Sequence, residues 1–482
     1  MKITTKGSQD HLYVRIADTI ESQISTEVIK IGEKLPSVRI LSKEHGVSLS
    51  TVLQAYYHLE SKGLIEARPQ SGYYVKFSHK RFPATPEKSQ PPATSGDNQA
   101  EEIITSVYSN LADNSLIKFS LSVPAPELLP IAKLNKAMVD AMRDLPAGGT
   151  NYENIQGNPE LRRQIAKWSL LWDGKLNGND IVTTAGCMNA VAFSLMAITE
   201  RGNTIAVESP TYFGILQLAC NLGLKVLELP TDSETGIDVD ALKLTFQKHK
   251  IKACVLMSNF NNPIGCCIPD DSKKEIVKLI QYYHVPLIED DLYGDVYFAK
   301  SRPKTCKTYD DSGLVLWCGS VSKTLAPGYR VGWVAPGMFL EKIKMLKMYH
   351  LVSSSTLEQE AVARFLGNGR YEHHLRKLRN TLHTNSMQYT RAISEYFPEG
   401  TRITRPQGGF LLWVELDKRV DTFELYKKAL KYGISIGPGR MFTLQNQYLN
   451  CMRLSYGLLW SKQIDEALRT LGTLAGEMVF NH

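Results

Sequence analysis

The chain has 482 residues, of which 43% are hydrophobic and 22% are charged. This composition is ordinary for a soluble globular protein, and the length exceeds what one hydrophobic core normally uses, so we expect at least two domains. The formal net charge of +7 is compatible with a nucleic-acid partner without requiring one.

The sequence indicates neither a secretion signal nor a membrane span. Residues Met1 to Asp10 are polar, no apolar h-region follows them, and no apolar run approaches the ~18 residues of a membrane span. We therefore expect a cytoplasmic protein without a membrane partner. The eight cysteines show no C-x-x-C spacing, so we expect reduced, mostly buried thiols and no metal site.

The first 80 residues predict a small helical module. Apolar residues recur at helical spacing from Leu12, which predicts an amphipathic helix to about Glu27. Ser37 is placed to cap a short second helix that ends at Gly46, and Ser48 or Ser50 to cap a third that ends near Lys62.

The third helix has two contrasting faces. Val52, Ala55, Tyr56 and Leu59 share one face, and the opposite face carries small or polar residues, namely Ser50, Thr51, Gln54, Tyr57 and His58. A hairpin, or wing, is predicted across residues 64–75. This layout is typical of a helix-turn-helix reader of DNA, although a helical domain with a solvated polar face fits the pattern equally well.

The segments L-P-S-V-R-I-L-S, V-S-L-S-T-V-L-Q-A-Y-Y-H-L-E-S-K-G-L-I and R-P-Q-S-G-Y-Y-V resemble the GntR-type winged helix-turn-helix from about Tyr13 to Val75. The resemblance implies a DNA operator as partner. It implies phosphate contacts from Ser37 and Arg39, base contacts from Ser50, Thr51 and Gln54, and minor-groove contacts from the wing residues Arg68, Gln70 and Ser71.

One position departs from the GntR pattern, because Leu49 stands where many members carry arginine. Residues 1–80 hold eleven Lys and Arg against eight Asp and Glu, a net charge of +3. We therefore expect one module to bind DNA modestly, and a dimer to supply useful affinity by joining two half-site contacts.

The domain boundaries follow from composition. We assign residues 1–79 to the DNA-binding domain, 80–100 to a Pro-rich linker and 101–482 to a large second domain. The linker holds four prolines and almost no large apolar residue, so we expect it to remain unordered, with a reach of up to roughly 60 Å.

The large domain alternates apolar strands with amphipathic helices, which predicts an α/β fold with a largely parallel sheet. Strands are expected at residues 180–184, 204–208, 225–229, 253–257, 285–289, 315–319 and 332–335. Ligands bind such sheets at the carboxyl ends of the strands. The candidate site residues follow those ends.

Lys323 lies in S-V-S-K-T-L-A-P-G-Y-R-V-G-W, between Ser320 and Arg330. A glycine turn that opens a helix at Gly186 is suited to a phosphate. An aromatic, an amide, a carboxylate and a lone guanidinium follow other strands, at Tyr212, Asn262, Asp290 and Arg453. Each of these alone is an ordinary core or surface residue. Together and in this order they resemble the aminotransferase class I/II family of fold-type I pyridoxal-phosphate (PLP) enzymes over about Phe119 to Leu471.

The resemblance implies PLP as cofactor and assigns the roles. Lys323 forms the internal aldimine and Asp290 pairs with the pyridine nitrogen. The ring oxygen is bound by Asn262 and Tyr293, the ring face is covered by Tyr212, and the phosphate is held by Gly186, Cys187, Ser320 and Arg330. Tyr152 matches a tyrosine that reaches the phosphate of the neighbouring subunit, which implies a homodimer, and Arg453 matches the arginine that clamps a substrate carboxylate.

A winged helix-turn-helix, a Pro-rich linker and an aminotransferase-like domain in one chain resemble the MocR subfamily of GntR-type transcription regulators. The resemblance implies a PLP-dependent regulator that senses an amino compound through aldimine exchange at Lys323. A functional aminotransferase with a secondary DNA-binding module is the alternative, and PLP as the regulatory ligand itself is a third.

Overall fold

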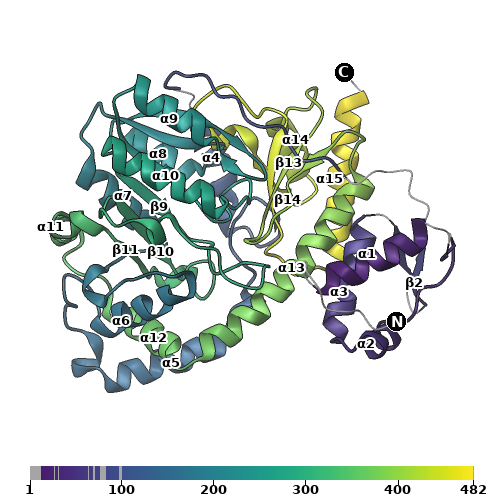
Figure 1. Cartoon of the computed structure of the whole chain (residues 1–482), viewed down its shortest axis with the longest axis horizontal. Helices are drawn as coiled ribbons and strands as arrows, with labels where there is room; N and C mark the ends of the chain where they lie inside the picture. Colours follow the sequence, from purple (N-terminus) through teal and green to yellow (C-terminus); the bar gives the residue numbers. More distant parts are fainter. Residues whose placement is uncertain are drawn as a thin grey trace.

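The computed structural model describes residues 12–25, 28–30, 32–62, 64–68, 71–75, 83–96 and 100–480. A small N-terminal module lies beside the long helix α13 at one end of a larger α/β body (Figure 1). No helix among these residues is both long and apolar enough to cross a bilayer. All eight cysteines are free thiols, and six of them are buried.

The N-terminal module is a winged helix-turn-helix, as predicted. Its elements are α1 (Leu12–Ser25), α2 (Val38–His45), α3 (Leu49–Ser61), β1 (Ile65–Arg68) and β2 (Gly72–Val75). Ser37 caps α2 by accepting the N–H of Ile40 at 3.3 Å. Ser48, rather than Ser50, caps α3. The antiparallel wing pairs Ile65 with Val75, and both side chains join the buried core of the three helices.

The polar face of α3 is exposed only in part, although the sequence predicts that the whole face is open to solvent or DNA. Ser50 is exposed near the N-terminus of α3, but the C-terminal half of this helix packs against α13. Glu60 lies 3.7 Å from Arg391 of α13, and the ring centroids of Tyr13 and His383 are 5.5 Å apart. His58, predicted to face outward, lines the cavity between the module and α13. The large domain therefore covers part of the polar face of α3.

The large sheet has eight strands in the order β4-β11-β10-β9-β8-β5-β6-β7. They are β4 (Val182–Thr184), β5 (Thr204–Ser209), β6 (Lys225–Asp232), β7 (Gly236–Ile237), β8 (Ile251–Leu256), β9 (Leu287–Asp290), β10 (Val315–Ser320) and β11 (Gly332–Ala335). The five strands from β10 to β6 run parallel, whereas β11 is antiparallel to both β10 and β4, and β7 is antiparallel to β6. The prediction of a largely parallel sheet is confirmed, and only β11 and β7 run against the other strands.

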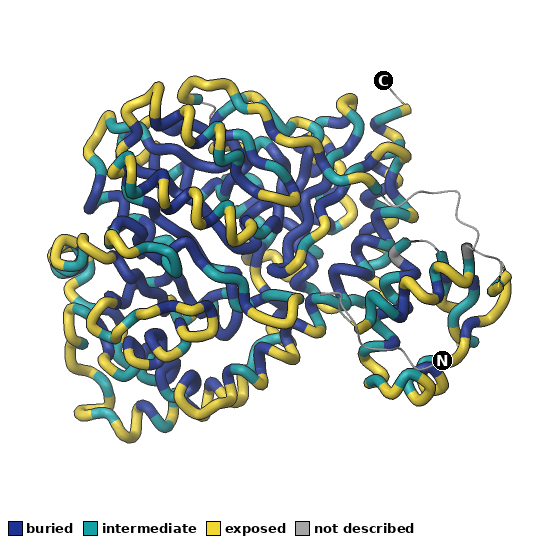
Figure 2. The backbone as a smooth tube through the Cα atoms, viewed as in Figure 1, coloured by how far each residue is buried: buried dark blue, intermediate teal, exposed yellow. Residues whose placement is uncertain are grey.

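Helices cover both faces of this sheet. The helices of the large domain are α4 (Glu101–Ser109), α5 (Ile131–Asp144), α6 (Pro159–Ser169), α7 (Cys187–Ile198), α8 (Phe213–Asn221), α9 (Val239–Lys248), α10 (Asp270–Tyr283), α11 (Leu340–Leu351), α12 (Thr356–Gly367), α13 (Arg370–Tyr396), α14 (Thr422–Leu430) and α15 (Lys462–Phe480). Along β8, Val255 packs with α7 and α8, while its neighbours Cys254 and Leu256 pack with α9 and α10. This alternation makes the strands almost wholly buried (Figure 2).

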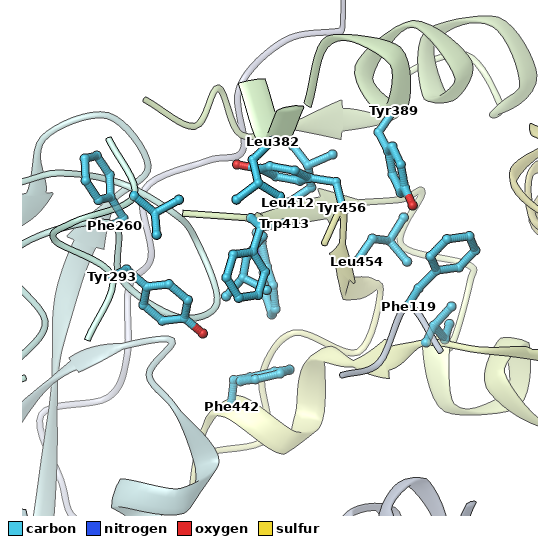
Figure 3. Close-up of a cluster of buried hydrophobic side chains, with 14 of the residues drawn as sticks. Phe119, Phe260, Tyr293, Leu382, Tyr389, Leu412, Trp413, Phe442, Leu454 and Tyr456 are labelled. Carbon is cyan, nitrogen blue, oxygen red and sulfur yellow. The ribbon is translucent and has the colours of Figure 1, made fainter. Parts of the chain in front are cut away.

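A smaller antiparallel sheet follows near the C-terminus, in the order β12-β13-β16-β15. Its strands are β12 (Arg402–Ile403), β13 (Leu411–Glu415), β15 (Gly437–Pro438) and β16 (Cys451–Ser455), and a separate parallel pair joins β3 (Ile117–Lys118) to β14 (Ile434–Ser435). The large-sheet region and the small C-terminal sheet meet in a buried cluster of side chains. In this cluster Phe260 and Tyr293 lie on one side, Phe119 on the other and Trp413 between them (Figure 3).

The linker lies against the large domain over residues 83–96. The N–H of Ser89 donates to the carbonyl of Thr231 at 3.1 Å, and the N–H of Thr231 donates to Ser89 Oγ at 2.7 Å. Ile403 donates its N–H to the carbonyl of Ala84 at 2.9 Å, and Glu87 pairs with Arg402 at 2.6 Å. The expectation that this whole segment remains unordered is wrong here, because strand edges and charges of the large domain satisfy its polar groups. Residues 80–82 and 97–99 lie outside the described residues.

We predict that Ser89→Ala loosens this segment, because the buried N–H of Thr231 then loses its acceptor, at a cost of about 1–3 kcal/mol. Hydrogen–deuterium exchange of the full chain should become faster across residues 83–96. Ser95→Ala, at an exposed serine of the same segment, is the control and should leave exchange unchanged. Equal exchange in both variants would contradict the contact's importance.

Candidate functional site

Lys323 lies in the loop after β10, which ends at Ser320, and it is partly buried between the two sheets. Its Nζ donates a hydrogen bond to the carbonyl of Ser122. Burial, together with the nearby Arg453 charge, lowers the pKa of Lys323 to about 8, and Asp290 opposes the shift. At pH 7 roughly one amine in ten is therefore neutral, and a neutral amine can attack a carbonyl carbon.

Asp290 ends β9, an interior strand of the large sheet between β10 and β8, and only 2% of it is exposed. Its Oδ1 accepts hydrogen bonds from Cys187 Sγ and from the N–H of Leu292, both at 3.2 Å. Burial raises the pKa of Asp290 to about 6, and these two bonds oppose the shift. The carboxyl group therefore still carries a negative charge at pH 7, buried where it can pair with a cationic ligand atom.

A glycine turn and an arginine form a cup at the start of α7. Gly186 caps α7 with φ of 86°, and a Cβ atom there would lie 2.2 Å from Arg330 Nη2. Arg330 donates to the carbonyl of Ala185 at 3.0 Å, so the guanidinium lies across the turn. Ser320, at the end of β10, is 8% exposed. The helix N-terminus, the guanidinium and the hydroxyl together can hold a phosphate.

Arg453 brings the small sheet into the site from β16. The residue is fully buried, donates to Asn262 Oδ1 at 3.0 Å and to the carbonyl of Ser120, and its Nε has no hydrogen-bond partner. Within the described part of the chain no carboxylate lies within 4.0 Å of this guanidinium. A buried cation without a counter-charge is costly, so the arrangement suits an anionic ligand such as a carboxylate.

The aromatic candidates divide between the interior and the surface. The Tyr293 hydroxyl is buried without a partner, and Lys323 Nζ lies 5.9 Å from the centroid of the Tyr293 ring. Tyr212 lies at the start of α8, half-buried against Phe213. Tyr152, by contrast, is 86% exposed and lies outside the buried site.

Two comparisons with known proteins agree with this geometry. Residues 117–471 match the family "Aminotransferase class I and II", and residues 12–75 match "Bacterial regulatory proteins, gntR family". The HTH-type transcriptional regulator YjiR of Escherichia coli is 38% identical over 465 residues, which cover 95% of this chain and 98% of YjiR. The chain belongs to the MocR-type HTH transcriptional regulators.

One further relative covers nearly the whole chain, and solved aminotransferase structures cover about four fifths of it. The regulator NorG of Staphylococcus aureus is 26% identical over 91% of this chain and 99% of its own length. Among solved structures, the α-aminoadipate aminotransferase LysN of Thermus thermophilus, complexed with N-(5'-phosphopyridoxyl)-L-leucine, is 25% identical, with a TM-score of 0.72 over 80% of this chain and all of LysN. The MocR-type regulator therefore carries a fold-type I aminotransferase domain, whose cofactor is PLP.

The residues of this regulator fit PLP. The hydroxyl of Tyr293 and Nε of Arg453 are buried polar atoms without partners, so the region between the sheets has unused hydrogen-bonding capacity. The Gly186 turn leaves space that a Cβ atom would fill. Asp290 supplies a buried carboxylate and Lys323 a partly neutral amine. Each group of the cofactor finds a chemically matched residue here.

The DNA-binding candidates of the regulator lie on the N-terminal module. Ser37 and Ser50 are exposed near helix N-termini, Arg39 is exposed on α2, and Thr51 and Gln54 are half-buried on α3. In the wing, Arg68 pairs with Glu66 at 2.9 Å and lies 4.3 Å from the Tyr74 ring centroid, and Ser71 bonds the Tyr74 hydroxyl at 2.7 Å. Gln70 lies outside the described residues.

Three residues of the site were not identified from the sequence in the part they play here. The backbone carbonyl of Ser122 accepts a hydrogen bond from Lys323 Nζ. A pattern of side chains in the sequence does not reveal a backbone contact of this kind. The thiol of Cys187 reaches Asp290, whereas the resemblance placed Cys187 only at the phosphate. Glu208 lies fully buried next to the last residue of β5, and burial raises its pKa to about 8, so a neutral acid lies behind the site.

We predict that Gly186→Ala releases PLP, because the added Cβ collides with Arg330. Gly202→Ala is a matched control, since Gly202 has the same φ of 86° but open space around its Cβ position. Both substitutions should cost about 1–3 kcal/mol of backbone strain, and Gly186→Ala should in addition weaken PLP binding by about tenfold or more. Fluorescence titration with PLP measures the difference. Equal affinity for PLP in the two variants would contradict the proposal that the Gly186 turn and Arg330 hold the phosphate.

We predict that Asp290→Asn stabilises the cofactor-free chain while weakening PLP binding. The pKa of Asp290 is raised from 3.8 to about 6, so the folded state holds a proton that the unfolded state has lost, and stability falls as the pH rises through this window. Asparagine removes a penalty of about 3 kcal/mol at pH 7. Urea unfolding at pH 4 and pH 7 should show the gain only at pH 7. Asp311→Asn, at an exposed carboxylate, should show no such difference.

Proposed function

We propose that the chain is a PLP-dependent, DNA-binding transcription regulator that senses an amino compound at Lys323. The observation that carries the proposal is the buried guanidinium of Arg453, which lies near enough to lower the pKa of Lys323 and lacks a carboxylate partner among the described residues. The PLP aldehyde carbon that Lys323 would hold and the Arg453 cation, which lacks a carboxylate partner, match the amino group and the acid group of an amino acid. The effector class that follows is an amino compound carrying an acid.

The proposed roles follow from each residue's chemistry. When bound, PLP supplies an aldehyde carbon and an electron-withdrawing ring. Gly186, Cys187, Ser320 and Arg330 would hold the phosphate, Asn262 and Tyr293 would bind the ring oxygen, and Tyr212 would cover the ring face. Asp290 would supply a negative charge for the ring nitrogen, and the Lys323 amine would hold and release a proton.

We further propose a homodimer with shared sites, located in the cytoplasm where the operator is. Tyr152 is exposed and free to reach the phosphate of a second subunit, and Val139 and Met142 of α5 are 62% and 54% exposed, which supports a covering partner. Two modules on one dimer would bind two half-sites. In that complex Arg39 contacts phosphate and Gln54 contacts a base edge.

A functional aminotransferase is the second candidate, and the set of PLP-suited residues around Lys323 favours it. Steady turnover of an amino donor with a 2-oxo acid would support this function. A stable spectral shift without turnover would support the sensor.

The deciding experiment uses the full chain, its PLP and genomic DNA fragments. We predict selective binding of one fragment, changed by an amino acid in the native chain and unchanged in Lys323→Ala, which keeps the DNA module but lacks the reactive amine. Lys304→Ala, at a partly exposed lysine paired with Asp173, is the control and should respond normally. Failure of the native chain to prefer any fragment over random DNA, with steady amine turnover, would replace the regulator by the aminotransferase.

A further inference from the structure

A basic cleft lies between the start of α5 and the N-terminal half of α13, apart from the Lys323 site. Its volume is about 310 Å³, within the range of small-molecule sites. Lys133, His373, His374 and Lys377 line it, together with one acid, Glu127. None of these residues belongs to the PLP site proposed above.

His374 connects this cleft to the lysine loop. Only 7% of His374 is exposed, and its Nε2 lies 2.6 Å from the carbonyl of Thr324, the residue after Lys323. A carbonyl can only accept, so Nε2 carries the proton, and Nδ1 is left as the ring nitrogen that can accept a proton. A second contact supports the link, since Tyr371 of the same helix bonds Thr324 Oγ1 at 2.9 Å.

Positive charge exceeds negative charge in the cleft, because two lysines and one glutamate line it. In the described part of the chain, no acidic side chain lies within 4.0 Å of Lys133, His373 or Lys377. Burial lowers the pKa of His374, the hydrogen bond to Thr324 raises it, and Lys133, Lys377 and His373 lower it further. An anion between Lys133 and Lys377 would offset the repulsion of these two charges and favour a proton on His374 Nδ1, which then becomes a donor toward the anion.

We propose that this cleft is a second ligand site, which binds a small anion carrying phosphate or carboxylate groups and reports its presence to Lys323 through His374 and Thr324. Lys133 and Lys377 supply the charge from two different helices, α5 and α13. His374 supplies a donor that forms only when the anion is present. A protonated imidazole strengthens the bond to the Thr324 carbonyl and so changes the loop that holds Lys323.

The test measures anion binding to the PLP-loaded full chain, so that the cofactor already fills the phosphate cup. Inorganic phosphate and succinate are titrated calorimetrically at constant ionic strength. The double variant Lys133→Gln/Lys377→Gln should weaken binding about tenfold or more, since two charged contacts are lost. Lys243→Gln/Lys248→Gln, which removes two exposed charges from α9, should bind normally.

The two probes distinguish the ligand source. Binding of phosphate alone that depends on Lys133 and Lys377 assigns a phosphorylated ligand, and binding of succinate alone with the same dependence assigns a dicarboxylate. Either result supports the proposal that the cleft binds a small anion. Saturable binding of neither probe, or equal loss in both double variants, would overturn the proposal.

His374→Gln tests the connection to Lys323, because glutamine keeps a donor for the Thr324 carbonyl but takes up no proton. In the native chain, saturating phosphate should move the pH midpoint of the visible PLP absorbance band by about 0.3 unit or more. The variant should show no such movement while its thermal stability stays close to that of the native chain. An equal movement in the variant would overturn the role of His374.

Discussion

Burying the guanidinium of Arg453 is the constraint on which the large domain depends. A charge withdrawn from water must find hydrogen-bond acceptors or a counter-ion, and here the acceptors are the carbonyl of Ser120 and the side chain of Asn262. Arg453 and these two acceptors come from three distant parts of the sequence. The early segment, the central sheet and the small C-terminal sheet must therefore meet at one place, and the amine of Lys323 meets the same early segment at Ser122.

The helix α13 links this buried centre to the DNA-binding module. Its 27 residues extend about 40 Å, and it touches the lysine loop at Thr324 through Tyr371 and His374. Farther along, Arg391 lies 3.7 Å from Glu60 of the module. One stiff element thus contacts both the loop that carries Lys323 and the helix predicted to read DNA, a physical route by which a ligand can alter the placement of the module.

The position of linker residues 83–96 changes the point at which the DNA-binding module is attached to the large domain. Residues 83–96 lie on the large domain, so the module is tethered near residue 83 and not at residue 100. The Pro-rich composition predicted an unordered segment, because it offers little apolar surface to bury. That expectation failed for residues 83–96 because backbone groups of the large domain, and charges such as Arg402, bind the segment without a hydrophobic core.

The sequence by itself determined the elements of both domains and the residues around Lys323, because helix caps, strand periodicity and motif order are local properties that the chain carries in any context. The caps at Ser37 and Gly46 and the strand at 332–335 show this directly. Only the tertiary structure decided the packing of α3 on α13, the Cys187 thiol beside Asp290 and the basic cleft at His374. Each of these depends on contacts between residues far apart in the chain, and a single sequence has no local pattern that specifies such pairs.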